Sequence, residues 1–188
     1  MKKVIALALA AVMALSMVAC GGETAPTATT YKVGMGVVVE ATEADATADK
    51  EGQRQINTTV ALITIDGEGK IVKADIDVAQ QTSKVTATGV VTATDDFRTK
   101  MEKGPDYGMK AEWGSLIGEW NEQIEGFEAW MVGKTVDEVV NMELGPNSHA
   151  DGTGAYEDTP VVEDLKATTT ISMTAFLNAI KEANTNAK

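Results

Sequence analysis

The spacing of the apolar residues changes along this chain, and this change constrains the fold more than any other feature. Up to residue 78 the apolar residues tend to alternate, which is typical of half-buried strands. Beyond residue 112 they recur at every third or fourth position, which is typical of amphipathic helices. Strands followed by helices predict an α+β fold, in which an antiparallel sheet is packed on one face by two or three helices.

The first strand is predicted over residues 31–40, which read YKVGMGVVVE. The alternation places four apolar side chains on one face, which it predicts to be buried: Val33, Met35, Val37 and Val39. Gly34 and Gly36 fall on the opposite face. The lack of a side chain there lets a helix, a bulge or a ligand approach closely, and packing by protein is the commoner cause.

A hairpin is predicted to follow the polar loop at residues 42–53. Residues 56–66 are rich in β-branched residues, Asp66 to Gly69 supply turn residues, and apolar and charged residues then alternate over residues 71–78. The Thr-rich residues 84–94 are a candidate for one more strand.

A long amphipathic helix is predicted in the middle of the chain. Its apolar stripe consists of Trp113, Leu116, Ile117, Trp120, Ile124, Phe127 and Met131. Thr135 and Glu138 match a capping box, which predicts a second short helix that ends near Met142. A terminal helix is predicted from the apolar face that comprises Ile171, Met173, Phe176, Leu177 and Ile180.

Aromatic residues in the helical stripe favour burial against the sheet over stacking on a flavin or a sugar. Trp130 lies off this stripe and is predicted to be the exposed aromatic residue.

Residues 143–163 are predicted to form an irregular loop, because Gly, Pro, Asn and Asp are dense there. Ser148, His149 and Asp151 lie too close together in this loop to form a hydrolytic triad. Its carboxylates do not match an EF-hand, so a solvated acidic surface is favoured over a Ca²⁺ site. The single histidine excludes the usual zinc sites, and these observations favour a binding role over an enzymatic one.

The N-terminus has the layout of an export signal, with Lys2 and Lys3 before an apolar stretch and a small residue before Cys20. The stretch MVAC followed by GG resembles the bacterial lipobox, in which the cysteine is lipidated and becomes the new N-terminus. We therefore expect a signal peptide over residues 1–19, a lipidated tether over residues 20–30 and one α+β domain over residues 31–188. The resemblance implies a lipoprotein anchored at the extracytoplasmic face of the cell membrane through lipid on Cys20.

The charge of the chain disfavours some partners. The formal net charge is −12, and removal of Lys2 and Lys3 with the leader makes it −14. So acidic a surface repels nucleic acid, and solubility is a sufficient reason for the charge.

The end of the chain carries a resemblance to a family. The lipobox, the Val- and Ile-rich hairpin, the helical middle and the C-terminal segment EDLKATTTISMTAFLNAIKEA resemble the FMN-binding domain of bacterial surface lipoproteins. In that family, a segment D-x-x-S-G-A-T before a helix carries the flavin by a phosphoester on its last Thr. The resemblance implies an FMN site formed by Asp164, Thr168, Thr169, Thr170 and Ser172, with Thr170 in the attachment position.

This segment departs from the family motif at three positions. Ala167 stands in place of the Ser, Thr168 in place of the Gly and Thr169 in place of the Ala. A β-branched residue crowds a phosphate where glycine allows close approach, so we expect weak covalent attachment or none.

Two functional classes remain open from the sequence. The first is an electron-transfer flavin module at the cell surface, with redox or protein partners that the residues do not identify. The second is a cofactor-free ligand-binding or protein-interaction lipoprotein. The middle region, residues 106–140, is similar to little-characterised lipoproteins of Gram-positive bacteria and does not separate these classes.

The anchoring hypothesis predicts the outcome of the change Cys20→Ser. The variant lacks the thiol that accepts the lipid, so the protein should be released from the membrane fraction or remain unprocessed. Fractionation combined with labelling by a fatty acid checks this. Membrane-bound, lipid-labelled Cys20→Ser protein would contradict it.

Overall fold

The computed structural model describes residues 30–148 and 155–188. The predicted leader and tether, with Cys20, lie outside the described residues, as do His149 and Asp151. Among the described residues, no helix combines the length and the apolar composition that crossing a membrane requires.

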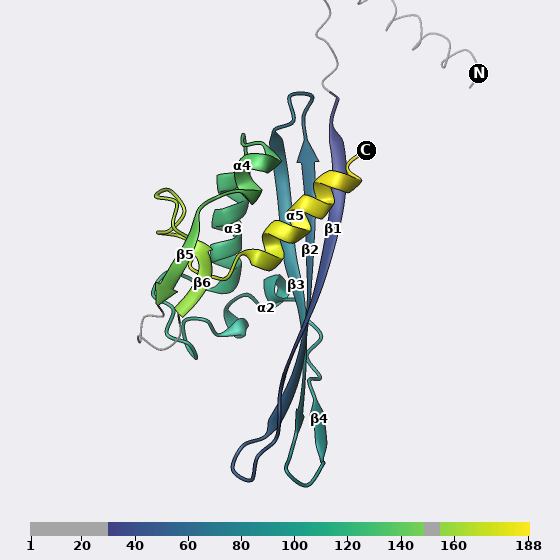
Figure 1. The fold of residues 1–188 in the computed structure, drawn as a ribbon, viewed down its shortest axis with the longest axis vertical. Helices are drawn as coiled ribbons and strands as arrows, with labels where there is room; N and C mark the ends of the chain where they lie inside the picture. Colours follow the sequence, from purple (N-terminus) through teal and green to yellow (C-terminus); the bar gives the residue numbers. More distant parts are fainter. Residues whose placement is uncertain (1–29, 149–154) are drawn as a thin grey trace, which may run out of the picture.

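The described residues form a four-stranded antiparallel sheet. Its strands are β1 (Lys32–Ala44), β2 (Gly52–Ile65), β3 (Ile71–Val85) and β4 (Val91–Ala93), in the order β1-β2-β3-β4. The predicted hairpin is confirmed, because β2 pairs with β3 across a turn in which Asp66 accepts the backbone N–H groups of Glu68 and Lys70. The strands are longer than predicted, and one end of the sheet extends beyond the helices as an arm that includes β4 (Figure 1).

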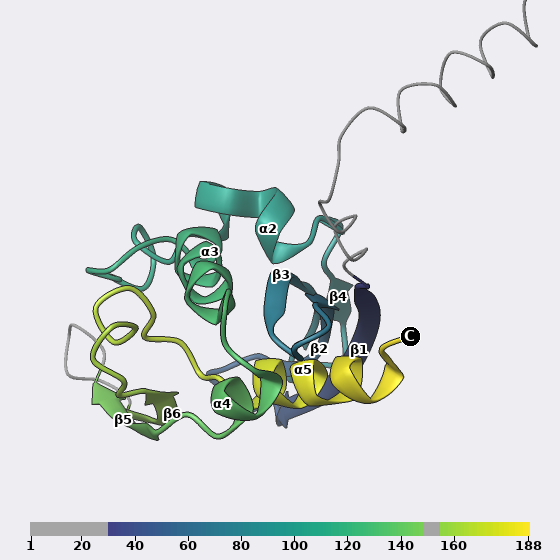
Figure 2. The same cartoon turned by 90° about the horizontal axis from the view of Figure 1, so that it is seen from above.

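Four helices lie within the described ranges: α2 (Lys100–Lys103), α3 (Trp120–Met131), α4 (Val136–Val140) and α5 (Thr174–Asn186). A 3-10 helix, η1 (Gly104–Tyr107), follows α2. Figure 2 shows α5 lying across β1 and β2, while α3 lies beside β3. The predicted α+β architecture is confirmed. Fully buried residues from both layers form the core, among them Ile63, Ile71, Ile124, Phe127, Met131 and Ile180.

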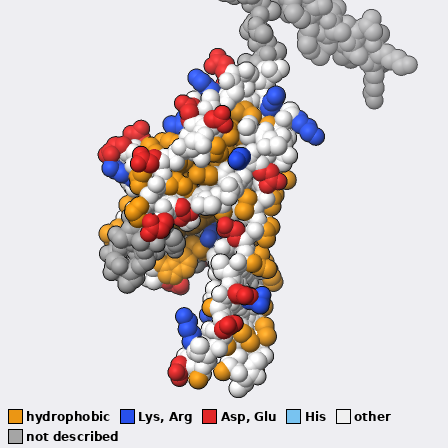
Figure 3. Space-filling model, in the orientation of Figure 1, with side chains coloured by type: hydrophobic (Ala, Val, Ile, Leu, Met, Phe, Trp, Pro, Cys, Tyr) orange, Lys and Arg blue, Asp and Glu red, His pale blue; other side chains and the backbone are white. Residues whose placement is uncertain are grey.

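The predicted orientation of β1 is wrong. Its apolar residues Val33, Met35, Val37 and Val39 are between 39% and 64% exposed, and Figure 3 shows hydrophobic side chains along the margin of the molecule formed by β1. Gly34 and Gly36 face the helices instead. A Cβ atom on either glycine would lie 1.9 Å from a backbone carbonyl oxygen of α5, so the expected close packing on the glycine face is confirmed.

The long middle helix is shorter than predicted. Helix α3 begins only at Trp120, after a loop in which Gly114 has a φ of 64°. Glu119 is the N-cap of α3, and it forms a capping box with Glu122. Of the predicted stripe, Trp120 and the residues after it are buried, whereas Trp113, Leu116 and Ile117 lie in the preceding loop and are exposed.

The prediction for Trp130 is also wrong, because this ring is half-buried and stacks on Phe127. Two other predictions about the helices hold. The capping box of Thr135 and Glu138 is confirmed at the start of α4. Ile171 and Met173 are buried as expected, although they precede α5 rather than belonging to it.

Part of the predicted irregular loop is a two-stranded hairpin formed by β5 (Leu144–Ser148) and β6 (Ala155–Pro160). The register shifts between Gly145 and Asn147, around Pro146, which has no N–H to donate to the ladder. The Thr159 hydroxyl donates to the carbonyl of Gly145. Pairing across the loop stabilises a segment that its composition alone does not identify as strand.

Helices and the C-terminus cover parts of both edges of the sheet. Along β1, the backbone of Lys188 pairs with that of Val33, and the Asn186 side chain donates to the carbonyl of Met35. Along β3, the Glu128 carboxylate of α3 accepts the N–H of Ile76 at 2.6 Å. Unpaired strand edges invite association with other strands, and these contacts block that association where the helical layer lies.

The close approach of α5 predicts that Gly36→Ala destabilises the protein. The added methyl group would meet the Ala179 oxygen at 1.9 Å and the Ala183 nitrogen at 2.7 Å. Because both are backbone atoms, the helix must shift, at a cost of about 2 kcal/mol or more. Chemical denaturation measures this cost. Gly67→Ala, in the β2–β3 turn where the nearest atom is 3.7 Å away, is the control and should change stability by less than about 1 kcal/mol. Equal stability of the two variants would mean that α5 does not rest on β1.

The environment of Glu128 predicts a dependence of stability on pH. Burial, together with the charges of Asp75 and Glu125, raises the pKa of Glu128 to about 7, although the hydrogen bond from Ile76 opposes this rise. The folded state therefore keeps a proton that the unfolded state releases above about pH 4.5. The stabilisation that this proton provides is complete below pH 4.5 and is lost as the pH rises through 7.

The change Glu128→Gln removes this titration but keeps an oxygen that accepts the Ile76 N–H. Relative to the wild type, the variant should gain stability between pH 4.5 and pH 7, as measured by urea denaturation across this range. Glu51→Gln, at an exposed position in the β1–β2 turn, is the control. A constant stability difference between wild type and Glu128→Gln from pH 4 to pH 8 would disprove the role of Glu128.

Candidate functional site

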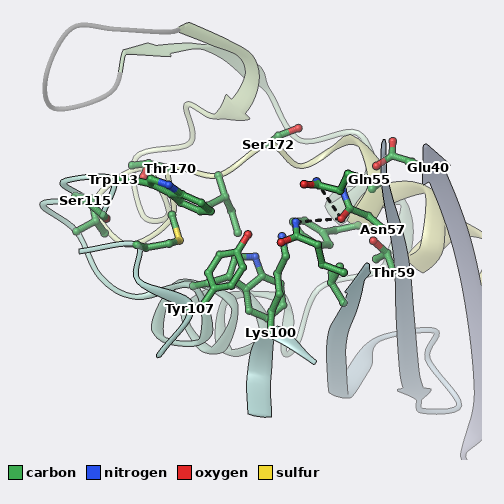
Figure 4. Close-up of a pocket in the computed structure, with 18 of the residues that line it drawn as sticks. Glu40, Gln55, Asn57, Thr59, Lys100, Tyr107, Trp113, Ser115, Thr170 and Ser172 are labelled. Atoms are coloured by element: carbon green, nitrogen blue, oxygen red, sulfur yellow. Dashed lines mark hydrogen bonds between the residues drawn. The ribbon is translucent and has the colours of Figure 1, made fainter. Parts of the chain in front are cut away.

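A pocket of about 490 Å³ lies between the sheet, the loop before α3 and the segment before α5. Figure 4 shows how the labelled side chains surround it: Gln55, Asn57 and Thr59 of β2 line one side, and Trp113, Ser115 and Thr170 lie across from them. Lys100 and Tyr107 lie between these two groups in the view of Figure 4. Cavities of this size, with mixed apolar and polar walls, are typical of sites for small molecules and cofactors.

Aromatic rings form the apolar wall. Tyr107 and Trp113 meet edge to face, with their ring centroids 5.1 Å apart. Trp120, at the start of α3, packs against Phe176 of α5 at 6.2 Å. Trp113 is 49% exposed, whereas Trp120 is 3% exposed, so the two rings have different structural roles. Trp120 belongs to both the core and the pocket, and Trp113 presents its ring at the rim.

Amide side chains form the opposite wall. The Gln55 and Gln80 amides both donate to Asn57 Oδ1, at 3.3 Å and 3.1 Å, as the dashed lines of Figure 4 show. Gln53 donates to Gln55 Oε1 and extends this row toward the arm. Amides carry both donors and acceptors, so this wall can bind a ring edge that presents carbonyl and N–H groups.

Gln123 connects the two segments that complete the pocket. Its side chain is fully buried on α3 and donates to the Gly118 carbonyl at 3.1 Å, while its Oε1 accepts the Thr170 N–H at 2.9 Å. The Thr170 hydroxyl donates to the same oxygen at 3.2 Å, and the Thr169 hydroxyl donates to the Gln123 carbonyl. A buried amide with these partners satisfied holds both segments in one arrangement.

The loop before α3 is also held by carboxylates. Glu119 accepts the backbone N–H groups of Met109, at 2.8 Å, and Lys110. Glu122 accepts the Lys110 ammonium and the Glu119 N–H, each at 2.7 Å, and the hydrogen bond from Lys110 is the main cause of its lowered pKa. These bonds place Met109, Trp113 and Ser115 at the pocket.

The structure brings two of the five predicted cofactor-binding residues, Thr170 and Ser172, to the pocket. The other three lie outside its lining. Asp164 is exposed in a turn, Thr168 is exposed and donates to the Leu165 carbonyl, and Thr169 is buried against Gln123. The predicted segment therefore contributes one end to the pocket, while its first part is a surface turn.

The N-terminus of α5 already has an acidic partner. The Asp158 carboxylate of β6 accepts the hydroxyls of Ser172 and Thr174, at 2.5 Å and 2.6 Å, and the Thr174 N–H at 3.2 Å. Burial raises the pKa of Asp158, but these hydrogen bonds outweigh burial and leave the pKa below its ordinary value. A phosphate at this helix end would meet a carboxylate of the same charge.

Several pocket residues were missed by the sequence analysis. Gln55 and Asn57 line the pocket, and together with Gln53 they place an amide at every second position of β2, so this polar alternation was a usable signal. Lys100 and Tyr107 had no such signal, because only the packing of α2 and η1 brings them to the pocket. Across the residues that the structure describes, no group of three or more His, Cys, Asp or Glu side chains is placed to hold a metal ion.

Comparison with known proteins gives one match. The chain is 31% identical over 122 residues to a chlorophenol reductase of Desulfitobacterium hafniense, and the alignment covers 57% of this chain and 37% of the relative. No protein-family model and no solved structure matches. The chain spans little more than a third of the length of this relative, so what is established is a distant similarity of part of the chain to a protein named as a reductase.

Proposed function

We propose that this chain is a flavin-binding redox module, held at the extracytoplasmic face of the membrane by lipid on Cys20. One observation carries the redox part. Thr170, which is in register with the flavin-carrying Thr of the family it resembles, lines a pocket whose other walls are aromatic rings and amides. The similarity to a protein named as a reductase also supports a redox role.

The side chains that line the pocket are chemically suited to a flavin ring. Trp113 and Tyr107 provide aromatic surface against which a planar ring can pack. Gln55, Asn57 and Gln80 provide donors and acceptors for the polar edge of the ring. A bound flavin would supply electron transfer that no amino-acid side chain supplies. The protein would bind the ring, orient it and limit its contact with water.

The segment before α5 fits a covalently attached phosphate less well. The Thr170 hydroxyl is engaged with Gln123, and the Asp158 carboxylate occupies the start of α5. Thr168 also stands where the family has glycine. These features favour non-covalent binding, with the ring rather than the phosphate providing most of the affinity.

The proposal predicts that the purified protein binds FMN and riboflavin and quenches their fluorescence. Trp113→Ala should weaken binding about fivefold or more, because it removes stacking surface worth about 1 kcal/mol or more at the rim of the pocket. The matched control is Phe97→Ala, which removes an aromatic ring that is 72% exposed and does not line the pocket. Fluorescence titration measures both affinities, and circular dichroism verifies that both variants are folded.

Acid precipitation after co-expression with a flavin transferase tests for a covalent bond, with Thr170→Ala as the negative control. The double change Ala167→Ser with Thr168→Gly should increase labelling if crowding is the obstacle. Absence of flavin from the wild type under all these conditions would disprove the redox proposal. The cofactor-free binding lipoprotein would then be the remaining hypothesis.

A further inference from the structure

Lys100 is the cation in the wall of the pocket. It is the first residue of α2, which is fixed to the sheet because the Met101 N–H donates to the Asp77 carboxylate at 3.2 Å. The Lys100 ammonium lies 4.8 Å from the centroid of the Tyr107 ring and 5.5 Å from that of the Trp120 ring. Cation–π contacts with both rings hold the charge at the aromatic wall.

The neighbouring cations are paired with carboxylates, whereas Lys100 has no such partner in the part of the chain that the structure describes. Arg98 pairs with Asp96 and Asp106 at 3.0 Å and 2.9 Å, and Lys103 pairs with Asp96 at 3.9 Å. Within residues 30–148 and 155–188, no carboxylate oxygen lies within 4 Å of the Lys100 ammonium. Glu40, the carboxylate residue in the pocket lining, lies at the far side of the view in Figure 4, beyond the amides.

Burial destabilises the charged form of Lys100 when no ligand is bound. Burial, with a smaller contribution from the charge of Lys103, lowers the pKa of Lys100 to about 8. A partly desolvated ammonium with no carboxylate partner is less stable than one in water. An anionic group of a ligand would offset this cost by supplying the missing partner.

The surroundings of Lys100 suit a delocalised anion better than a phosphate. A phosphate needs several hydrogen-bond donors to replace its hydration. The flanking rings of Tyr107 and Trp120 do not provide such a set. In contrast, a reduced flavin ring at neutral pH carries a negative charge that is spread over ring nitrogen and carbonyl oxygen, and its flat faces pack on aromatic rings.

We propose that Lys100 pairs with the anionic edge of a reduced flavin ring, so that the pocket binds the reduced cofactor more tightly than the oxidised one. This inference rests on the proposed function and adds which redox state the site favours. A positive charge beside that edge raises the reduction potential of the bound flavin. Lys100 thus serves as a cofactor-facing cation, while the amides of β2 and β3 bind the ring in either state.

Anaerobic titrations with riboflavin and with FMN, each oxidised or reduced by dithionite, test the inference. The wild type should bind both reduced flavins more tightly than the oxidised forms. Lys100→Met, which keeps the apolar stem, should lower this preference at least tenfold. For a two-electron couple, tenfold corresponds to a shift of the midpoint potential by about 30 mV to a more negative value. Lys100→Arg should retain most of the preference.

Lys103→Met is the matched control, because this lysine is on the same helix but does not line the pocket. It should change the preference and the potential much less than Lys100→Met does, because the charge of Lys103 makes only the smaller contribution at Lys100. If the wild type binds flavin and Lys100→Met keeps the full preference, the inference is wrong while the proposed function stands. A loss confined to FMN and equal in both redox states would place the ammonium at the phosphate and would also overturn the inference. No binding by the wild type would instead disprove the proposed function.

Discussion

The contact between α5 and the two glycines of β1 determines where the rest of the structure can lie. Gly34 and Gly36 let backbone meet backbone at a separation that any side chain would prevent. Because α5 rests there, the segment before it reaches the pocket with Thr170, and Phe176 packs against Trp120. The end of α5 then covers the edge of β1. The lack of side chains at these two positions of β1 therefore determines where α5 lies, how the edge of β1 is covered and where one wall of the candidate site is placed.

Gln123 has a second organising role, which is chemical rather than steric. Its buried amide holds both the loop before α3 and the segment before α5, with its donors and acceptor satisfied at short distances. Such a group stabilises only the arrangement in which its partners are present, since an unpaired amide in the core is costly. The side chain therefore specifies how the two segments meet. A shape defined by a satisfied core amide is suited to a ligand that must bind in one orientation.

Electrostatics within the site differ from those of the whole chain. The protein carries a formal net charge of −12, yet its pocket contains the ammonium of Lys100, which has no carboxylate partner among the residues that the structure describes. At the start of α5, in contrast, Asp158 supplies a negative charge where a phosphate-binding helix would leave the position open. The aromatic wall at Lys100 therefore favours an anion, whereas the start of α5 disfavours one. This separation is the reason that the ring, rather than the phosphate, dominates the proposed mode of flavin binding.

Local features of this protein follow from the sequence alone. These features depend on residues that are only a few positions apart in the chain. They include the turn at Asp66, the capping box of Thr135 and Glu138, and the burial of Ile124 and Phe127. Only the tertiary structure decided which face of β1 is buried, because alternation separates two faces without showing which one meets a helix. The candidate site was only partly predictable, because a local pattern identifies a segment but not the residues that it meets in the fold. A segment motif indicated Thr170, but its meeting with Lys100 and the amides of β2 depends on contacts between residues far apart in the chain, which no local pattern encodes.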